Sequence, residues 1–340
     1  MTQCSLPAVF MRGGTSKALM LHARDLPADR EAWTPLLCRA MGSPDSYGRQ
    51  LDGMGGGVSS LSKVCVIAPA ARPDFDVDYT FVQVAIHEAR IDLAGNCGNM
   101  SSAVGPFAID EGLVRPRPGD AATVRIFNTN TRKAIHATFP LIGGRAREKG
   151  ELAIPGVAGT GAAIRLDFLD PGGATTGRLL PSGRTRDVLE VPGHGSIEAS
   201  LVDAANATVF VRAADLGLTG RERPDEVDAR PDLLIRLEAI RAAGSVAMGI
   251  APDLAAAHAV RMVPFICFVS PPDDGEEGDL VIRAISNGQA HRALPLTVSL
   301  CTAAAAQIDG TVVAACRRAA SPRDRCALRC PRASWPSTRR

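Results

Sequence analysis

The feature of this sequence that most constrains its fold is an internal repeat. A set of landmarks occurs twice in the same order, with the copies about 200 residues apart. The first landmark is a strand that ends at Asp25-Leu26 and again at Asp215-Leu216, and the second is a helical stretch that ends at Gly42-Ser43 and again at Gly244-Ser245. Buried strands follow at 64–69 and at 266–271. Last, His87 precedes Cys97, and His291 precedes Cys301.

The repeat predicts two similar α+β domains, in each of which strands wrap a helix that begins just after the cysteine. We expect His87 and His291 to lie in the strands that precede these cysteines. The predicted N-terminal domain spans 1–185 and the predicted C-terminal repeat domain spans 186–316. Residues 317–340 hold eight Arg and one Asp without helical or strand periodicity, which predicts a disordered basic tail. A solvated tail is favoured over a nucleic-acid-binding arm, so we expect no nucleic-acid partner.

Composition narrows the class of protein. The chain is long for a single core, and 46% hydrophobic with 22% charged residues is typical of a soluble globular protein. The start lacks the pattern of a signal peptide, and no window has enough uncharged apolar residues to span a membrane. We therefore expect a cytoplasmic protein with no membrane partner and reduced cysteines. No Cys or His spacing matches a zinc site, so no metal is expected.

The segment around Cys97 carries the strongest local signal. It follows an alternating strand, 79–86, and is flanked by Gly and Asn before a helical stretch that we expect to begin at an Asn99 cap and to stop at Gly112. A cysteine at a helix N-terminus lies near N–H groups that bind carboxylates and lower a thiol pKa, so it can act as an acid or base. The alternative is a small buried core cysteine, but a core position does not need the neighbouring glycines.

Two further segments have donor groups or a basic side chain. Lys63 follows the glycine-rich run 53–57 and opens the buried strand 64–67, where desolvation would make it a base; an exposed lysine at a strand end is the alternative. The turn at 11–17 offers donors suited to carboxylates, or is an ordinary polar turn. Its donor residues are Arg12, Thr15, Ser16 and Lys17.

These segments resemble one family. MRGGTSK (11–17), QLDGMGG (50–56) with SSLSK (59–63), and GNCGNMSSAVGPFAIDEGLV (95–114) are similar to motifs of the PrpF family, and weaker similarity runs in order to about Val313. That family includes 2-methylaconitate cis-trans isomerase, methylitaconate Δ-isomerase and 4-oxalomesaconate tautomerase. The resemblance implies a diaminopimelate-epimerase-like α+β fold of two pseudo-symmetric domains, each a curled, barrel-like sheet around a central helix.

The resemblance also implies an activity. We expect a cofactor-independent isomerase that shifts an allylic proton in a small unsaturated di- or tricarboxylate, such as 2-methylaconitate. Such a reaction belongs to 2-methylcitrate (propionate) metabolism. A homodimer is the expected possible assembly. Lys63 and Cys97 are the implied acid/base residues. The implied substrate-binding residues are Arg12, Thr15, Ser16, Lys17, Gly55, Gly56, Ser60, Asn96, Gly98, Asn99 and Met100.

Two alternatives stay open from the sequence. Cys97 and Cys301 occupy equivalent positions of the repeat, as the two thiols of an amino- or imino-acid epimerase or racemase would. The family pattern also continues past Val313 with further strands, whereas this chain continues into basic sequence, as a frameshift would produce. We therefore expect an incomplete C-terminal domain, which leaves a non-catalytic remnant or an accessory protein as the other reading.

Overall fold

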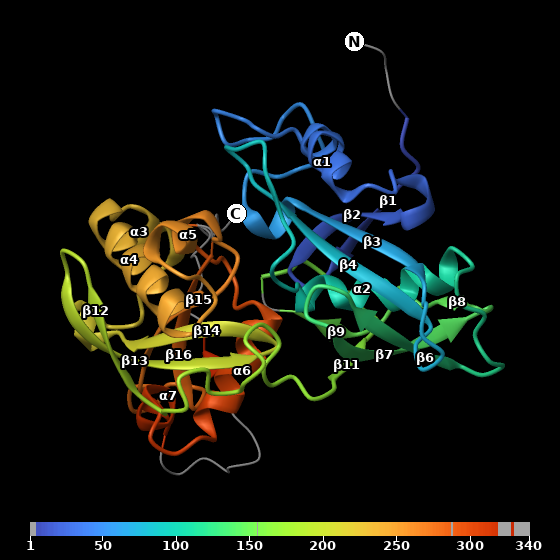
Figure 1. The fold of residues 1–340 in the computed structure, drawn as a ribbon. Coiled ribbons are helices and arrows are strands. Elements are labelled where there is room, and N and C mark those ends of the chain that lie inside the picture. The colour runs from blue at the N-terminus through green and yellow to red at the C-terminus, as the bar shows by residue number, and fades with distance from the viewer. Residues whose placement is uncertain (1–4, 155, 287, 319–327, 330–340) are drawn as a thin grey trace, which may run out of the picture. The chain divides into compact units, whose positions relative to one another are not determined.

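The structure, a computed structural model, describes residues 5–154, 156–286, 288–318 and 328–329. The chain forms two compact units that divide between Pro171 and Gly172 (Figure 1). Residues 172–185 follow this division and bond to the second unit, since Gly173 N–H donates to the carbonyl of Asp203 at 2.7 Å. Most of the predicted basic tail, 319–327 and 330–340, lies outside the described residues.

The first unit contains a nine-stranded sheet in which β2 is parallel to β3 and β4 is parallel to β6, while the other neighbours are antiparallel. Its strands are β1 (Val9–Gly13), β2 (Ser16–His22), β3 (Lys63–Pro69), β4 (Val77–Val84), β5 (Ile91–Asp92), β6 (Ala121–Asn128), β7 (Lys133–Ile142), β8 (Arg145–Ala146) and β11 (Arg165–Phe168). A separate pair is formed by β9 (Leu152–Ala153) and β10 (Thr160–Gly161).

Helices cover both faces of this sheet. The amphipathic helix α1 (Trp33–Met41) packs on one face, where its buried Leu37 and Met41 meet Val64 of β3 and Val82 of β4. The more uniformly buried α2 (Gly98–Asp110) packs against β1, β2, β6 and β7 on the other face, so the sheet curls around it (Figure 1). Short 3₁₀ turns η1 (Ala23–Asp25), η2 (Arg30–Ala32) and η3 (Ser59–Leu61) connect these elements.

Alternation along β3 decides which side chains face α2. Val64 and Val66 belong to the α1 side, and successive strand residues point to opposite faces. Lys63 and Cys65 therefore point to the α2 side, opposite the odd-numbered residues of β4, because Lys63 pairs with Gln83. The register thus places a lysine in the interior of the curled sheet.

The second unit contains a seven-stranded sheet. Its strands are β12 (Asp187–Val191), β13 (Gly195–Ala204), β14 (Asn206–Arg212), β15 (Phe265–Ser270), β16 (Leu280–Ser286), β17 (Gln289–Ala290) and β18 (Leu328–Arg329). Its helices are η4 (Ala214–Leu216), α3 (Pro224–Asp228), α4 (Pro231–Ala247), α5 (Leu254–Ala259), α6 (Leu296–Ala306) and α7 (Val312–Cys316). Leu233, Leu237 and Ile240 of α4 pack on one face of this sheet, and α6 and α7 contact β13 and β14.

The two units repeat the same order of elements, as the sequence predicts. In each unit an antiparallel hairpin (β1–β2 or β13–β14) is joined in parallel to a strand (β3 or β15) after an intervening helix (α1 or α4). An antiparallel strand (β4 or β16) and a further helix (α2 or α6) follow. Among the described residues, β6 has a two-residue counterpart, β18, whereas β7 and β11 have none. The chain is therefore a mixed α+β protein with one sheet curled around a helix and a second, smaller sheet.

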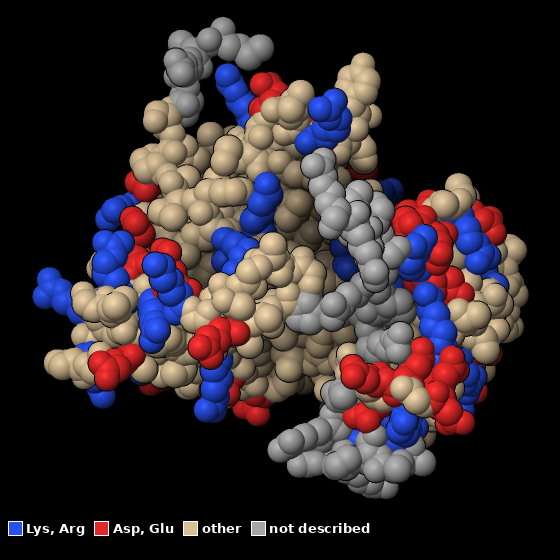
Figure 2. Space-filling view, turned by 180° about the vertical axis from the view of Figure 1, so that it is seen from behind, with Lys and Arg blue, Asp and Glu red and all other residues tan. Residues whose placement is uncertain are grey.

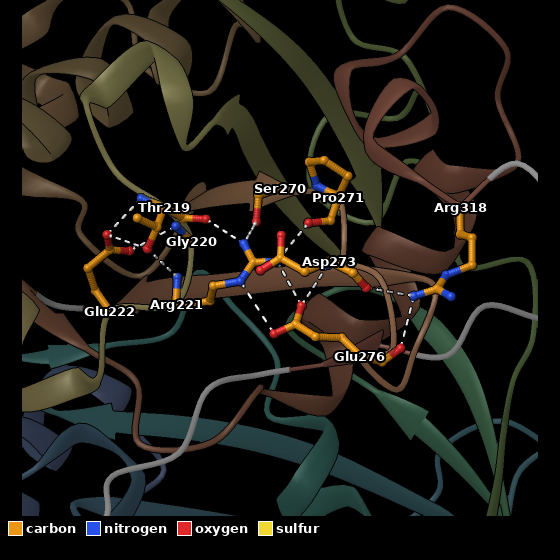
Figure 3. A network of polar contacts seen from close by, with 9 residues as sticks. All are labelled: Thr219, Gly220, Arg221, Glu222, Ser270, Pro271, Asp273, Glu276 and Arg318. Carbon is orange, nitrogen blue, oxygen red and sulfur yellow. Dashed lines mark hydrogen bonds and ion pairs between the residues drawn. The ribbon is translucent and has the colours of Figure 1, made fainter.

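A polar network ties together two loops of the second unit. Arg221 donates to the carboxylate of Glu276 at 2.7 Å and to the carbonyl of Pro271 at 3.1 Å, and it forms an ion pair with Asp273 at 2.9 Å (Figure 3). Arg318 donates to the carbonyl of Glu276 at 2.9 Å. On the face drawn in Figure 2, Lys and Arg side chains lie among Asp and Glu side chains, with uncharged surface between them.

Candidate active site

Lys63 is a buried amine at the first position of β3, with 5% of its surface exposed. Its Nζ donates to Oε1 of Gln83, directly across the strand pair, at 2.7 Å. The same Nζ lies 5.0 Å from the centroid of the Phe81 ring. The sequence left open whether Lys63 is exposed at a strand end, and the structure shows that it is buried.

Burial changes the acid–base behaviour of this amine. Loss of water around the Lys63 ammonium lowers its pKa from the ordinary value of 10.5, while the charges of ionised Cys97 and Cys65 would raise it. Burial in turn raises the pKa of the Cys65 thiol, which lies 3.7 Å from the hydroxyl of Tyr79, so Cys65 stays neutral and offers Lys63 no counter-charge. Burial therefore favours the neutral amine, with its basic lone pair, over the ammonium form.

The amide of Gln83 is held in one orientation by the backbone. Its Nε2 donates to the carbonyls of Ser59 at 3.0 Å and Ser62 at 2.9 Å, which occupies both of its hydrogens. Oε1 is therefore the atom that faces Lys63. The sequence did not single out Gln83, because its position opposite Lys63 depends on a strand register that no local pattern reports.

Cys97 is the N-cap of α2 and lies in the same interior. Its Sγ is 3.9 Å from the hydroxyl oxygen of Ser16 on β2, and its carbonyl accepts from the N–H of Ser101 at 3.0 Å. The Cys97 side chain makes no capping hydrogen bond, so the first N–H groups of the helix point into this region without a side-chain acceptor from their cap. These N–H groups belong to Gly98, Asn99 and Met100.

The prediction that Asn99 caps this helix was wrong, because the N-cap is Cys97 and the helix begins at Gly98. The side-chain amide of Asn99 is used instead for a tertiary contact, donating to the Thr15 hydroxyl at 3.0 Å. The predicted C-terminal stop is confirmed: α2 ends at Asp110, and Gly112 takes a left-handed φ of 73°.

The turn between β1 and β2 packs directly against the start of α2. A methyl group on Gly13 would lie 2.9 Å from Cα of Met100 and closer still to the carbonyl oxygen of Asn99. Gly14 has φ +53° and also faces Asn99. Two glycines are thus needed for the backbone to approach the helix, and this approach carries Thr15 and Ser16 to Asn99 and Cys97.

Arg12 and Lys17 are not brought to the α2 side with Ser16. They are cross-strand partners of each other, and alternation along β2 places Lys17 on the same face as Leu19, which packs in the α1 cluster. The Lys17 ammonium lies 5.0 Å from the ring centroid of Phe10, and Arg12 donates to the carbonyl of Gly14 at 2.9 Å. Their predicted roles in substrate binding stay predictions.

The glycine-rich loop folds around the buried side chain of Gln50. Its Nε2 donates to the Ser43 hydroxyl at 2.8 Å and to the Ser62 hydroxyl at 2.7 Å, and its Oε1 accepts from Gly57 N–H at 3.0 Å. A side chain on Gly55 would collide with the Gln50 amide, and one on Gly56 with Leu61. These glycines and the buried Ser60 of η3 therefore determine the path of the backbone immediately before Lys63.

A second buried amide network supports the loop before Cys97. Asn128 donates to Oδ1 of Asn96 at 3.1 Å, and its own Oδ1 accepts from the N–H and hydroxyl of Thr131, each at 2.9 Å. Asn130 bonds to the backbone N–H and carbonyl of Phe81 at 2.7 and 2.8 Å. The hairpin turn 128–131 thus contacts both Asn96, next to Cys97, and the backbone of Phe81 on β4. Met100, a predicted binding residue, is fully buried, so only its backbone N–H can serve.

The chain is similar to known proteins over most of its length. The family described as PrpF protein matches residues 3–334. The 3-methylitaconate isomerase of Eubacterium barkeri is 42% identical over 323 residues, which is 92% of this chain and 84% of that protein. The 2-methyl-aconitate isomerase of Shewanella oneidensis is 38% identical over 332 residues, or 92% of this chain and 83% of that protein. The chain belongs to the PrpF family.

A solved structure of similar sequence has the same fold. The crystal structure of methylitaconate-delta-isomerase matches with a TM-score of 0.75 and 40% identity, over 96% of this chain and 87% of that one. With relatives at this level of identity, the chain is an isomerase of the PrpF family. The family match runs to residue 334, beyond the Val313 at which the sequence comparison above placed its end.

The histidines of this PrpF protein do not lie where the repeat predicted. His87 is in the exposed connection between β4 and β5, with Nδ1 3.0 Å from the carbonyl oxygen of Asp45. His291 follows β17 rather than lying within a strand. Both predictions were wrong because a turn follows the long strand in each unit. After that turn only two residues, β5 or β17, pair with the sheet again before the cysteine.

The second repeated cysteine also differs from the first. Cys301 lies in the middle of α6, is fully buried, and has its pKa raised to about 12 by burial. A thiol in that position is neither at a helix N-terminus nor able to ionise near neutral pH, so the two-thiol reading of the PrpF chain has no support from its geometry. Within the described part of the chain, no cluster of three ligating side chains could hold a metal, and no helix is long and apolar enough to cross a membrane.

Proposed function

We propose that this PrpF isomerase moves a double bond in a small unsaturated di- or tricarboxylate, such as 2-methylaconitate or methylitaconate, by an allylic proton shift. The observation that carries the proposal is the buried amine of Lys63, whose pKa is lowered by burial. A neutral amine can act as a general base, and it can remove an allylic proton conjugated to a carboxylate when hydrogen-bond donors stabilise the negative charge that develops. The names of the relatives support this class of substrate.

The start of α2 supplies groups for the substrate carboxylates. The N–H groups of Gly98, Asn99 and Met100 carry the positive end of the helix dipole, and the Thr15 and Ser16 hydroxyls lie beside Asn99 and Cys97. Hydrogen bonds from N–H groups strengthen as negative charge develops on a carboxylate, which favours the transition state over the ground state.

The proton shift proceeds in two steps. The lone pair of Lys63 Nζ takes the allylic proton, and the C–H electron pair enters the π system to give a dienolate whose charge rests on the carboxylate. The dienolate then accepts a proton at the far carbon, either from the Cys97 thiol or from the Lys63 ammonium just formed. In the first route a proton returns from Lys63 to Cys97 to complete the cycle, and in the second Lys63 is restored directly.

The experiment is proton NMR of the enzyme in D₂O with a panel of unsaturated di- and tricarboxylates. Isomerisation of one acid by the wild type, lost in Lys63→Ala, supports the proposal and names the substrate. Deuterium at the newly protonated carbon, lost in Cys97→Ser, indicates delivery by the thiol, whereas partial transfer of the substrate's own hydrogen indicates that Lys63 both removes and returns it.

A matched control separates this mechanism from an epimerase with two thiols. Cys301→Ala removes a thiol of the same kind from the repeated position, and we expect it to keep turnover because Cys301 is buried within α6. Turnover that disappears in Cys301→Ala, in a sample that still melts cooperatively, or full activity in Lys63→Ala, would contradict the proposal.

A further inference from the structure

One buried side chain near the proposed base has no role in the mechanism so far. Gln83 contacts Lys63 Nζ at 2.7 Å, yet it is neutral and 3% exposed. A buried lysine is more commonly stabilised by a carboxylate partner, which would hold it as an ammonium. Gln83 satisfies the amine's hydrogen bond without supplying a counter-charge.

The orientation of Gln83 also determines which part of the amine it engages. Both Nε2 hydrogens are taken by the carbonyls of Ser59 and Ser62, so only Oε1 is left for Lys63, and Oε1 is an acceptor. A neutral amine must then donate one of its N–H groups to Gln83, which leaves its lone pair directed elsewhere. An amide in the opposite orientation would donate to that lone pair and block the base.

The surroundings leave this amide as the main polar partner of Lys63. The titratable groups that act on the Lys63 charge are the thiols of Cys97 at the start of α2 and Cys65 on β3 itself, and no carboxylate acts on it among the described residues. Phe81 presents its ring on the neighbouring strand. The residue opposite Lys63 on β4 therefore determines whether Lys63 has a counter-charge beside it.

We propose that Gln83 is a positioning residue that directs the Lys63 lone pair toward the substrate and keeps the amine free of a counter-charge. This inference rests on the proposed function, in which Lys63 is the base. In this role Gln83, whose amide is held by backbone carbonyls, favours the neutral Lys63 amine and the rotation of that amine that points its lone pair to the substrate. It extends the site from α2 and β3 to β4 and to the turn η3, whose Ser59 carbonyl orients the amide.

The composition of the chain makes the test direct. Of the 38 Lys and Arg residues only four are lysines, at 17, 63, 133 and 149, so a protein labelled with ¹³Cε-lysine gives four resonances. Lys63→Met assigns the signal of Lys63 by its disappearance. The titration midpoint of the Lys63 signal can then be followed without any substrate, in the wild type and in variants of the full chain.

The informative variant is Gln83→Glu, which has the same size and places a carboxylate beside the amine. We expect the Lys63 midpoint to rise by at least about one pH unit, and the acid limb of kcat/KM to move up by the same amount, so that activity lost at neutral pH returns at higher pH. Gln307→Glu, the same change at an exposed site after α6, is the control and should move neither. A Lys63 midpoint that does not move in folded Gln83→Glu overturns the inference.

A second variant covers the case in which Gln83→Glu does not fold. Gln83→Met keeps the volume but removes the acceptor, and we expect kcat to fall at least about tenfold at every pH with little change in KM, and no rise of the Lys63 midpoint. Full kcat in Gln83→Met would overturn the inference. Absence of isomerisation by the wild type on the whole acid panel would contradict the proposed function, whereas the NMR titration of Lys63 would still decide the role of Gln83.

Discussion

Lys63 and Cys97 show how environment, rather than residue type, distinguishes the proposed reacting groups of this chain. Loss of water lowers the pKa of the Lys63 amine, and the same loss of water raises the pKa of the Cys65 thiol on the same strand and keeps it neutral. Cys97 differs from Cys301 because it stands before a helix, and Cys301 stands within one. At the scale of single residues, the roles proposed for Lys63 and Cys97 therefore follow from burial and from position relative to a helix end.

Burial of Lys63 should carry a cost in stability that a substitution reveals. Because its pKa is lower in the folded chain than in the unfolded chain, the folded chain binds fewer protons between the lowered pKa and 10.5, and stability rises with pH across that window. The cost is fully present below the folded pKa and disappears above 10.5. We expect Lys63→Met to raise the free energy of unfolding by about 0.5–2 kcal/mol at neutral pH while abolishing turnover.

Denaturant unfolding at a series of pH values measures this effect. The gain in Lys63→Met over the wild type should shrink as the pH rises toward 10.5, while Lys133→Met, at a partly exposed lysine of β7, serves as the control and should show no such dependence. A Lys63→Met protein less stable than the wild type at neutral pH would contradict the account of Lys63 as a buried amine without a counter-charge.

At the scale of elements, the site depends on a close contact between the β1–β2 turn and the start of α2. Gly13 and Gly14 allow the turn to lie against Asn99, and the Thr15–Asn99 hydrogen bond fixes that position. The turn and the helix are far apart in sequence, yet they present the hydroxyl of Ser16 to the sulfur of Cys97. The proposed carboxylate-binding region is thus a junction between two elements rather than a property of either.

Gly13→Ala tests this junction. The added methyl group would overlap the backbone of Asn99 and Met100, which cannot move as a flexible side chain can, so the turn must shift away from α2. We expect a rise in KM for the acid substrate and a loss of about 1–3 kcal/mol in stability. Gly172→Ala, where a methyl group meets only Leu179 at an ordinary 3.5 Å, is the matched control for the glycine-to-alanine change. Unchanged KM in Gly13→Ala would contradict the role of this contact.

The elements also show how far sequence reasoning reaches. The repeat, the helix after Cys97 and the strand that Lys63 opens were predictable, because hydrophobic alternation and glycine stops are local signals. The Asn99 cap was predicted wrongly, because its amide is used in a tertiary contact with Thr15 that no local pattern contains. Gln83 was not predicted at all, since its partner is set by the register of β3 and β4.

At the scale of the whole molecule, two copies of one arrangement have diverged in what they carry. The strand position of Lys63 in β3 corresponds to Phe265 in β15, and the repeated cysteines differ in their place along the helix. The second unit instead concentrates charge in networks such as that of Arg221 (Figure 3). The repeat therefore predicts shared architecture but not shared chemistry.

Replacing Arg221 should weaken the second unit without altering the proposed chemistry. Arg221→Met would remove donors from the partly buried carboxylate of Glu276 and from backbone carbonyls, which we expect to cost about 1–3 kcal/mol. Arg165→Met, which removes an arginine 76% exposed and paired with Asp167, should cost less than about 1 kcal/mol. Thermal unfolding followed by circular dichroism compares the two. Equal melting temperatures for both variants would contradict a structural role for the network.

Because burial is what lowers the pKa of Lys63, the proposed base depends on the native structure around β3. When the strand pair opens, water returns to Lys63, its pKa returns toward 10.5, and the amine takes up a proton. A nascent, partly unfolded or damaged chain would then carry an ordinary charged lysine rather than a reactive one. If Lys63 is the base, as proposed, we expect turnover only from chains in which this strand pair is intact, so that activity reports on the folding of β3 and β4.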